Sequence, residues 1–505
     1  MKKYLSSFVM GAVWLAASVS ASPLETGLVA RIHFAGGDTV AADPNAASLK
    51  AVWSGPEAQA LRVQTVDKLS RFLDGWLGQQ VAPHLAVPLQ THALLFDLTQ
   101  AEWQLEVHQA AAGAVQFSLA VRLDNSRAQA WQTALNPVVA GWKQTSPAHH
   151  GQLQRKGDWV FLTLDNATVP AVPATVAGLN HQWLSAEVDW TRLAVWFPAV
   201  RTFDLPQTRL QVTGRNGNFE TTGNLSLAQP LPSLPNWQFP TNLVHWPFVS
   251  FTAARGIANW LHDQPWVNSM DLNPLPNQVF TWVEPQIPFL AFAALPLANA
   301  DAALPKIHDA LAARLQAEPV GSAYHGFSVT TEPNKVALVG LPLIAPYVEA
   351  RQVGGANFLV SGFLPATPRG KPAPKEIYNR LNTPNLIYFH WEVTAERQKV
   401  FPGLYQLGLV VTRHRQLEAT SAAGRWLAHL APELGPTVTT ATEISPTEVA
   451  FERHAPGGLT AVELVALCSW LEAPNFPGCD LHAPPPRHRP RPAGAAAPQP
   501  FTLHP

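Results

Sequence analysis

The chain has little of several features that mark common protein classes. Only 2 of its 505 residues are cysteine and only 3 are methionine. Charged residues make up 14% of the chain, against about a quarter in an average soluble domain. The formal net charge of -1 gives no overall electrostatic case for binding nucleic acid or an anionic membrane surface. Beyond the N-terminal segment no run of about 18 apolar residues occurs, so no transmembrane helix is expected in the mature chain.

Short motifs that identify the common enzyme classes are absent as well. The sequence contains no HExxH, no GxSxG, no GxGxxG after a predicted strand, no Walker loop, no EF-hand loop and no CxxC. Their absence disfavours metalloproteases, lipases and the common dinucleotide or nucleotide enzymes. No cofactor and no metal are expected, because His149-His150 is an isolated pair in a polar loop with no second cluster at ligand spacing. The missing motifs do not exclude an enzyme whose catalytic residues come from distant positions in the sequence.

Residues 1-21 are predicted to be a secretory signal peptide. Lys2 and Lys3 precede the apolar stretch FVMGAVWLAASV, which is too short to span a membrane, and small residues end at Ala21, where cleavage is expected. A buried N-terminal helix is the alternative interpretation. Since Ser22 rather than cysteine follows, bacterial lipidation is not indicated, and we expect a periplasmic or extracellular protein.

The two cysteines lie close together near the end of the chain. In an oxidising compartment, Cys468 and Cys479 are candidates for a disulfide that joins the last predicted helix to the loop behind it. Two free thiols, one of them buried in the helix, are the alternative.

Proline, in contrast, is abundant at 47 residues, which favours many short elements with sharp boundaries. The clearest group of elements spans residues 289-341. It contains an apolar strand, a helix with apolar residues three or four apart, and a hairpin that turns at Glu332-Pro333-Asn334. A similar β-α-β-β pattern begins near residue 115, and aligning Gly151 with Gly326 places the two patterns about 175 residues apart. This similarity predicts an internal repeat.

These patterns predict an α+β protein of two related domains, each an antiparallel or mixed sheet with helices packed on one face. The predicted divisions after the signal peptide are an N-terminal domain at 22-228, a Pro-rich linker at 229-240, a C-terminal domain at 241-479 and a disordered tail at 480-505. The tail is rich in proline, arginine and histidine and is a candidate for contact with anionic envelope polymers or lipid headgroups; a disordered end without such a contact is the alternative.

The best local candidate for catalysis is the predicted strand NLIYFHWEVT. Its polar residues alternate with apolar ones, so His390 and Glu392 share one face of the strand, about 7 Å apart. A glutamate beside a histidine is suited to acid-base chemistry in a hydrolase. The alternative is a solvated polar face on a strand that buries only its other side.

Three further residues are candidates for ligand binding. Arg255 precedes a glycine and offers a cation to an anionic ligand, although single arginines are usually solvated. Trp246 and Trp266 lie in Pro-rich or irregular stretches, so they are the tryptophans most suited to stack a ligand on an exposed ring. Ordinary core packing is the alternative for any one tryptophan.

Two stretches, 240-261 (PTNLVHWPFVSFTAARGIANWL) and 385-398 (NLIYFHWEVTAERQ), resemble stretches of large exported bacterial proteins of unassigned function. The resemblance implies export and no particular activity, and it assigns no functional residue. The favoured function is therefore a non-enzymatic exported protein that binds a ligand or scaffolds envelope components, with an envelope polymer or another exported protein as partner. An extracytoplasmic hydrolase that uses His390 and Glu392, and a carrier of an apolar ligand such as a lipid, are the alternatives.

Overall fold

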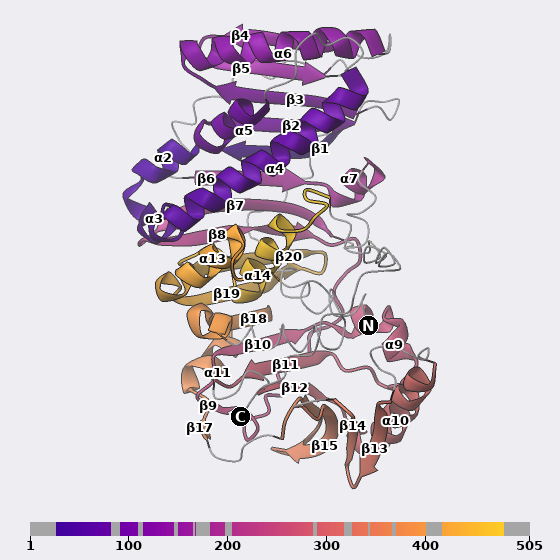
Figure 1. Cartoon of the computed structure of the whole chain (residues 1–505). Helices are drawn as coiled ribbons and strands as arrows, with labels where there is room; N and C mark the ends of the chain where they lie inside the picture. Colours follow the sequence, from indigo (N-terminus) through magenta and orange to yellow (C-terminus); the bar gives the residue numbers. More distant parts are fainter. Residues whose placement is uncertain are drawn as a thin grey trace, which may run out of the picture.

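The fold is built around one antiparallel sheet of 18 strands (Figure 1). The structure, a computed structural model, describes residues 27-81, 91-109, 115-145, 150-164, 167, 182-196, 205-285, 290-317, 326-341, 344-365, 370-399 and 417-478. The predicted signal peptide and tail lie outside these residues. None of the helices described is long and apolar enough to cross a membrane.

The first half of the chain supplies eight strands. They are β1 (Leu28–Phe34), β2 (Trp103–Gln109), β3 (Val115–Arg122), β4 (Gly151–Lys156), β5 (Trp159–Leu164), β6 (Gln182–Val188), β7 (Gln207–Arg215) and β8 (Asn218–Ser226). The second half supplies the other ten. They are β10 (Ser250–Arg255), β11 (Gln278–Val283), β12 (Ala291–Pro296), β13 (Ser328–Glu332), β14 (Lys335–Val339), β15 (Tyr347–Val353), β16 (Ala356–Gly362), β18 (Leu386–Val393), β19 (Pro436–Ser445) and β20 (Glu448–Ala455). Two short strands, β9 (His245–Trp246) and β17 (Lys371–Pro372), pair separately.

The strand pairing gives one continuous order across the sheet. From one edge to the other it is β4-β5-β3-β2-β1-β6-β7-β8-β20-β19-β18-β10-β11-β12-β16-β15-β14-β13. The two halves meet where β8 pairs with β20, between Phe219 and Ala455 at one end and between Ser226 and Glu448 at the other. We call this pairing the seam.

The prediction of two separate α+β domains, each with its own sheet, is wrong. Two separate sheets would leave the backbone groups of β8 and β20 unpaired at exposed edges, and the seam pairs these groups with each other instead. The divisions of the chain at 22-228, 229-240 and 241-479 stay predictions.

The strand order around the seam is nevertheless similar on its two sides. Eight strands of the first half follow the order β4-β5-β3-β2-β1-β6-β7-β8, and β15-β16-β12-β11-β10-β18-β19-β20 follow the same order in the second half. The hairpin of β13 and β14 is additional. The correspondence therefore matches β4 with β15, whereas aligning Gly151 with Gly326 had matched β4 with β13.

Helices cover one face of the sheet around the seam (Figure 1). The helices of the first half are α2 (Gly37–Ala42), α3 (Ala47–Trp53), α4 (Pro56–Val81), α5 (Thr91–Gln100), α6 (Asn125–Thr145) and α7 (Trp190–Trp196). Those of the second half are α8 (Ala258–His262), α9 (Pro265–Asn268), α10 (Ala300–Gln316), α11 (Lys375–Leu381), α13 (Ala422–Leu430) and α14 (Ala461–Leu471). An apolar cluster that includes Leu61, Trp426 and Leu464 joins α4, α13 and α14, so helices from both halves of the chain pack together.

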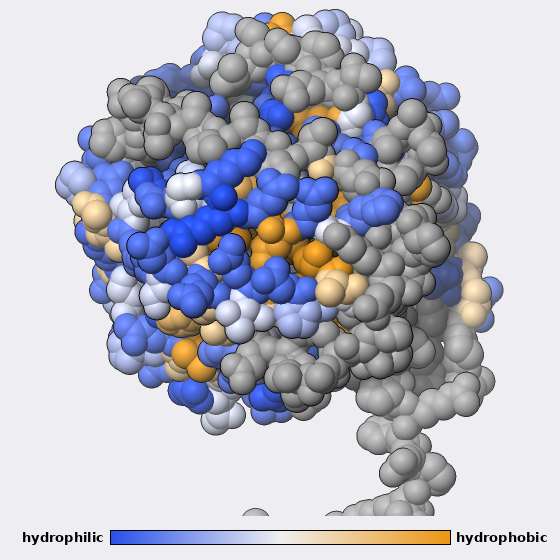
Figure 2. Space-filling model, turned by 90° about the horizontal axis from the view of Figure 1, so that it is seen from above, coloured by the Kyte–Doolittle hydropathy of each residue, from blue (hydrophilic) through white to orange (hydrophobic). Residues whose placement is uncertain are grey.

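The largest apolar cluster lies within the second half. It contains Phe251, Phe280, Trp282 and Phe389, which are at most 2% exposed. Segment 230-240 has no regular secondary structure, and Trp237 and Phe239 pack against this cluster. At the end of the molecule that carries β4 and α6, the residues coloured by hydropathy are mainly hydrophilic, with a small hydrophobic area near the centre of the view (Figure 2).

Candidate functional site

The structure brings His390 and Glu392 together on β18, but it buries them. His390 Nε2 lies 3.3 Å from Glu392 Oε2, and His390 Nδ1 lies 2.8 Å from the hydroxyl oxygen of Thr252 on β10. Glu392 is 1% exposed and His390 8% exposed. The alternative interpretation of a solvated strand face is therefore wrong, because β18 lies between β10 and β19 with α14 beyond its polar face.

Glu392 anchors the start of α14. Its Oε1 accepts a hydrogen bond from the backbone N–H of Ala461, the first residue of the helix, at 2.8 Å, and one from the Thr394 hydroxyl at 2.9 Å. A carboxylate is favourable at this positive end of a helix. Burial by itself raises the pKa of Glu392, but the hydrogen bonds and the charge of His390 outweigh it, so the pKa lies below its ordinary value. The carboxylate is thus ionised, and its oxygens are engaged in packing the helix.

A second carboxylate holds the same helix end. Glu463 forms a capping box with Thr460 at the start of α14. Arg453 on β20 donates two hydrogen bonds to Glu463, at 2.9 and 3.0 Å, and a third to the hydroxyl of Thr439. The polar groups under α14 therefore form a structural network, which favours a structural role for the His390–Glu392 pair.

A more accessible set of charged residues lies on the opposite face of the sheet. On β20, Arg453 points toward α14, so its neighbours Glu452 and His454 point away from it. The strand register places a row of charged side chains on this second face, from β3 to β20. We call this row the charged ladder; it consists of Arg122, Glu102, His33, Arg31, Glu106, His108, Glu187, Arg209, Arg215, Glu220, Glu452 and His454.

The members of the charged ladder pair across neighbouring strands. Arg31 on β1 is central: its Nε lies 2.7 Å from Glu106 on β2, and its Nη1 lies 3.9 Å from Glu187 on β6. Arg209 on β7 lies 3.6 Å from Glu187. Burial raises the pKa of Glu106, but the hydrogen bond and charge of Arg31, together with His108, lower it below the ordinary value. The side chains of Arg31 and Glu187 keep about a third of their surface exposed.

Further pairs extend the ladder at both ends. Glu102 lies between His33, at 3.1 Å, and Arg122, at 3.3 Å. At the seam, Arg215 lies 3.1 Å from Glu220. Because partly exposed ion pairs contribute only about 0-1 kcal/mol each, these pairs exchange partners at low cost. The side chains of Arg122 and Arg215 are 47% and 66% exposed, so the ladder reaches the surface at these two residues.

Comparisons with protein-family models, with curated proteins and with solved structures found no match. The functional argument therefore rests on the geometry of this chain.

The ligand-binding candidates of the sequence lie apart from the charged ladder. Arg255 is used internally: it donates hydrogen bonds to the carbonyl oxygens of Leu386 and Pro235, at 2.6 and 2.8 Å, and its guanidinium lies over the ring of Trp237. Burial lowers its pKa, although the charge of Glu443 opposes this. Arg255 thus fixes segment 230-240 to the sheet.

The two tryptophan candidates differ in what the structure describes. Trp246 is 38% exposed, and its ring contacts Phe248 and Trp391 at the rim of the largest apolar cluster. Trp266 belongs to α9, but its side chain lies outside the described residues. Trp246 therefore keeps the accessible surface that ring stacking needs, and its role stays a prediction.

Cys468 is a free thiol in the structure and is buried in α14. Its Sγ donates to the carbonyl oxygen of Ala423 at 3.7 Å. Burial, with the nearby charge of Glu472, raises the pKa of this thiol to about 12. Cys479 and His149 lie outside the described residues, so the disulfide with Cys479 stays a prediction.

Two surface hollows lie away from the His390–Glu392 pair. One, of about 440 Å³, is lined by residues of α4, and the other, of about 620 Å³, is lined mainly by residues of α10. Both are open and lined by charged side chains such as Lys68 and Arg314, whereas a site for an apolar ligand is enclosed and mostly apolar. The carrier alternative gains no support from either hollow.

The sequence interpretation missed one group of residues at the seam. Glu220, Glu452 and His454 bring a nitrogen and two carboxylates close together. The only signal in the sequence is the Glu452-x-His454 spacing, which places two ligands on one face of a strand. The third residue lies more than 200 positions earlier, and only the pairing of β8 with β20 identifies it.

Proposed function

We propose that this protein is an exported, non-enzymatic binding or scaffolding protein, and that its charged ladder binds an extended charged polymer of the cell envelope. The observation that carries the proposal is the length of the ladder. It crosses seven strands, β3-β2-β1-β6-β7-β8-β20, which corresponds to about 30 Å at the usual strand spacing. A surface of this shape suits an extended chain better than a compact ligand.

The charges of the ladder support a partner that carries ionic groups along its length. From β3 to β8 arginines and glutamates alternate from strand to strand, so a bound polymer meets cations such as Arg31 and Arg209 at intervals. A pair whose two side chains both keep about a third of their surface exposed, such as Arg31 and Glu187, is weak in water, so a partner that supplies the same charge replaces it at little cost. Electrostatic attraction of this type weakens as salt screens it.

The hydrolase alternative has less support. The His390–Glu392 pair is nearly inaccessible, and Glu392 is engaged by Ala461 and Thr394. A general acid or base must lie within hydrogen-bond reach of its substrate. Activity of a His390→Ala variant in a broad hydrolase screen, compared with the unmodified protein, tests this alternative directly.

Co-sedimentation with insoluble cell-wall polymer tests the binding role. We expect the mature chain to sediment with the polymer at low salt and to be released at high salt. The Arg31→Gln/Arg209→Gln double variant should lose most of this binding, because both lie within the ladder. Lys306→Gln, on α10 and outside the ladder, is the matched control and should bind normally. Equal binding by the double variant and the control would exclude the ladder as the binding surface.

Export is a separate part of the proposal and rests on residues 1-21. N-terminal sequencing of the protein recovered from a bacterial host tests it, and we expect the mature chain to begin at Ser22 in the periplasmic or extracellular fraction. An intact Met1 in the cytoplasmic fraction would remove the basis for an envelope partner.

A further inference from the structure

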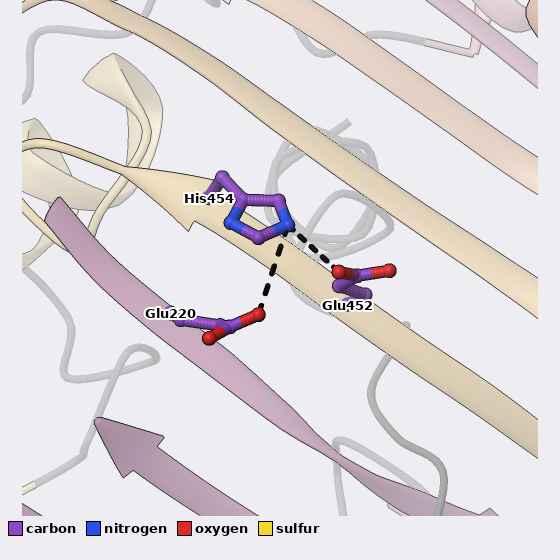
Figure 3. Close-up of side chains that lie close together, drawn as sticks. All are labelled: Glu220, Glu452 and His454. Carbon is purple, nitrogen blue, oxygen red and sulfur yellow. Dashed lines mark hydrogen bonds and ion pairs between the residues drawn. The ribbon is translucent and has the colours of Figure 1, made fainter. Parts of the chain in front are cut away.

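Three potential metal ligands converge at the seam (Figure 3). His454 on β20 lies directly opposite Glu220 on β8, and Glu452 lies two residues before His454 on the same strand. All three side chains therefore extend from the same face of the sheet. His454 Nε2 lies 2.7 Å from Glu452 Oε1 and 4.0 Å from Glu220 Oε1, and one ligand atom from each residue lies within 4.8 Å of the others.

We propose that Glu220, Glu452 and His454 bind a divalent transition metal ion, for which Zn²⁺ is the best match, at the seam of the sheet. Zinc takes imidazole nitrogen and carboxylate oxygen at bond lengths of about 2.1 Å, which puts tetrahedral ligand atoms roughly 3.4 Å apart. The observed separations of 2.7 and 4.0 Å lie on either side of this value, so small rotations of the side chains suffice.

The donor set selects among metals. A nitrogen ligand beside two carboxylates suits Zn²⁺ and related transition metals, whereas Mg²⁺ and Ca²⁺ prefer oxygen ligands throughout. The imidazole also separates this group from an ordinary cluster of acidic residues. With three protein ligands, a fourth position remains for water or for a group of a bound partner.

Strand pairing holds the backbone of the three potential ligands in place, and the negative charge of Glu220 and Glu452 favours a cation. Glu220 and His454 belong to strands that pair along their whole facing length, so two ligand positions are held before any metal arrives. Among the described residues, Arg215 is the cation that pairs with this group, 3.1 Å from Glu220 Oε1. The Arg215 side chain is 66% exposed and can therefore turn into solvent when a metal takes its place.

A second His–Glu pair on the same sheet face provides a matched comparison. Glu106 and His108 have the same two-residue spacing on β2, with His108 Nε2 3.4 Å from Glu106 Oε2. Glu106 is engaged by Arg31, and the positions that pair with His108 are Gln116 and Leu28 rather than an acid. Within the part of the chain that the structure describes, three such ligand atoms converge only at the seam.

Zinc titration of the whole mature chain tests the proposal. The chelator-treated protein is titrated with Zn²⁺ against a chromophoric chelator, and Co²⁺ absorption reports the coordination geometry. We expect the unmodified protein to bind one equivalent that His454→Ala loses, and Glu452→Gln to bind at least about tenfold more weakly. His108→Ala should keep the full stoichiometry. Arg215→Ala should bind more tightly, since it removes the competing cation.

The control variants keep the result interpretable in a chain with 18 histidines. If His454→Ala and the unmodified protein bind the same number of Zn²⁺ ions with the same affinity, the binding is adventitious and the proposal is wrong. If His454→Ala does not fold by circular dichroism, Glu452→Gln decides, because its side chain is about half exposed. This titration contains no polymer, so its outcome is independent of the polymer-binding proposal.

Discussion

Replacing Glu392 by glutamine is the sharpest test of how the sheet and its last helix are held together. Glutamine has nearly the same shape, but it removes the negative charge beside His390 and at the N-terminus of α14. The amide oxygen still accepts the N–H of Ala461, while the amide NH₂ group takes the place of the second carboxylate oxygen, which lies 3.3 Å from His390 Nε2. Since Glu392 is 1% exposed, solvent cannot compensate.

The expected loss is large for a single substitution. Removing one partner of a buried ion pair costs about 3-5 kcal/mol. The retained hydrogen bond to Ala461 offsets about 1 kcal/mol of this. We therefore expect Glu392→Gln to lower the free energy of unfolding by about 2-4 kcal/mol, and Glu392→Ala to lower it further because it also leaves the N–H of Ala461 without its acceptor.

Urea unfolding followed by tryptophan fluorescence measures the effect. A chain of this size can unfold in steps, so the quantity to compare is the urea midpoint of the transition that exposes the core tryptophans. Glu396→Gln is the matched control, because Glu396 forms a partly exposed pair with Lys399 and should change stability by less than about 1 kcal/mol. Equal midpoints for Glu392→Gln and Glu396→Gln would refute the structural role of Glu392.

The same pair predicts a pH dependence. The pKa of Glu392 is lower in the folded protein than its ordinary value of 4.5, so the unfolded chain takes up the proton first. Its contribution to stability is complete above the ordinary value and is lost as the pH falls through the lower, folded value. Stability of the unmodified protein should therefore fall more steeply below about pH 4.5 than that of Glu392→Gln. Parallel pH curves would contradict this.

Two glycines predict opposite changes in stability. Gly214→Ala should destabilise the protein by about 1-3 kcal/mol, because the added Cβ would lie 2.2 Å from the Trp183 ring. Gly75→Ala in α4 should stabilise it by about 0.5-1 kcal/mol, because the added Cβ meets nothing within 4 Å and alanine favours a helix. Urea midpoints that move in the same direction for both variants would refute this. Cys468 should resist iodoacetamide in the native protein, because the thiol is buried and its pKa is raised to about 12. Rapid labelling of native Cys468, measured by mass spectrometry, would contradict this prediction. Iodoacetamide treatment of the unfolded protein without a reductant tests the predicted disulfide. If Cys468 is bonded to Cys479, iodoacetamide leaves Cys468 unlabelled even after unfolding, whereas a free Cys468 is labelled.

Local structure was well predicted from the sequence where a single turn or cap decides it. Asn216 and Gly217 form an Asn-Gly pair, which favours a tight turn, and both have positive φ, at 53° and 79°, in the turn between β7 and β8. Asn334 likewise turns the hairpin of β13 and β14 at a φ of 58°. In these cases the residues that carry the signal are neighbours in the chain.

The errors arose where distant segments meet. Alternation in NLIYFHWEVT correctly grouped His390 with Glu392, but alternation does not show what packs on the polar side, and α14 begins almost 70 residues later. The seam is harder still: the Asn224 amide donates to Glu448 at 2.7 Å across 224 residues of sequence. The local sequences of β8 and β20 do not show that these two strands pair with each other. Two separate sheets were therefore predicted, and the potential metal ligands at the seam were missed.

The wide separation of β8 and β20 in the sequence has a consequence for synthesis of the chain. During synthesis, β8 is complete while more than 200 residues, including β20, are still to come. Until β20 arrives, the backbone groups along that edge of β8 can pair with any strand that approaches. Slow pairing of distant strands prolongs this interval. During this interval the middle of the final sheet is the part of the growing chain most open to aggregation, and a chaperone that covers the free edge of β8 would prevent it.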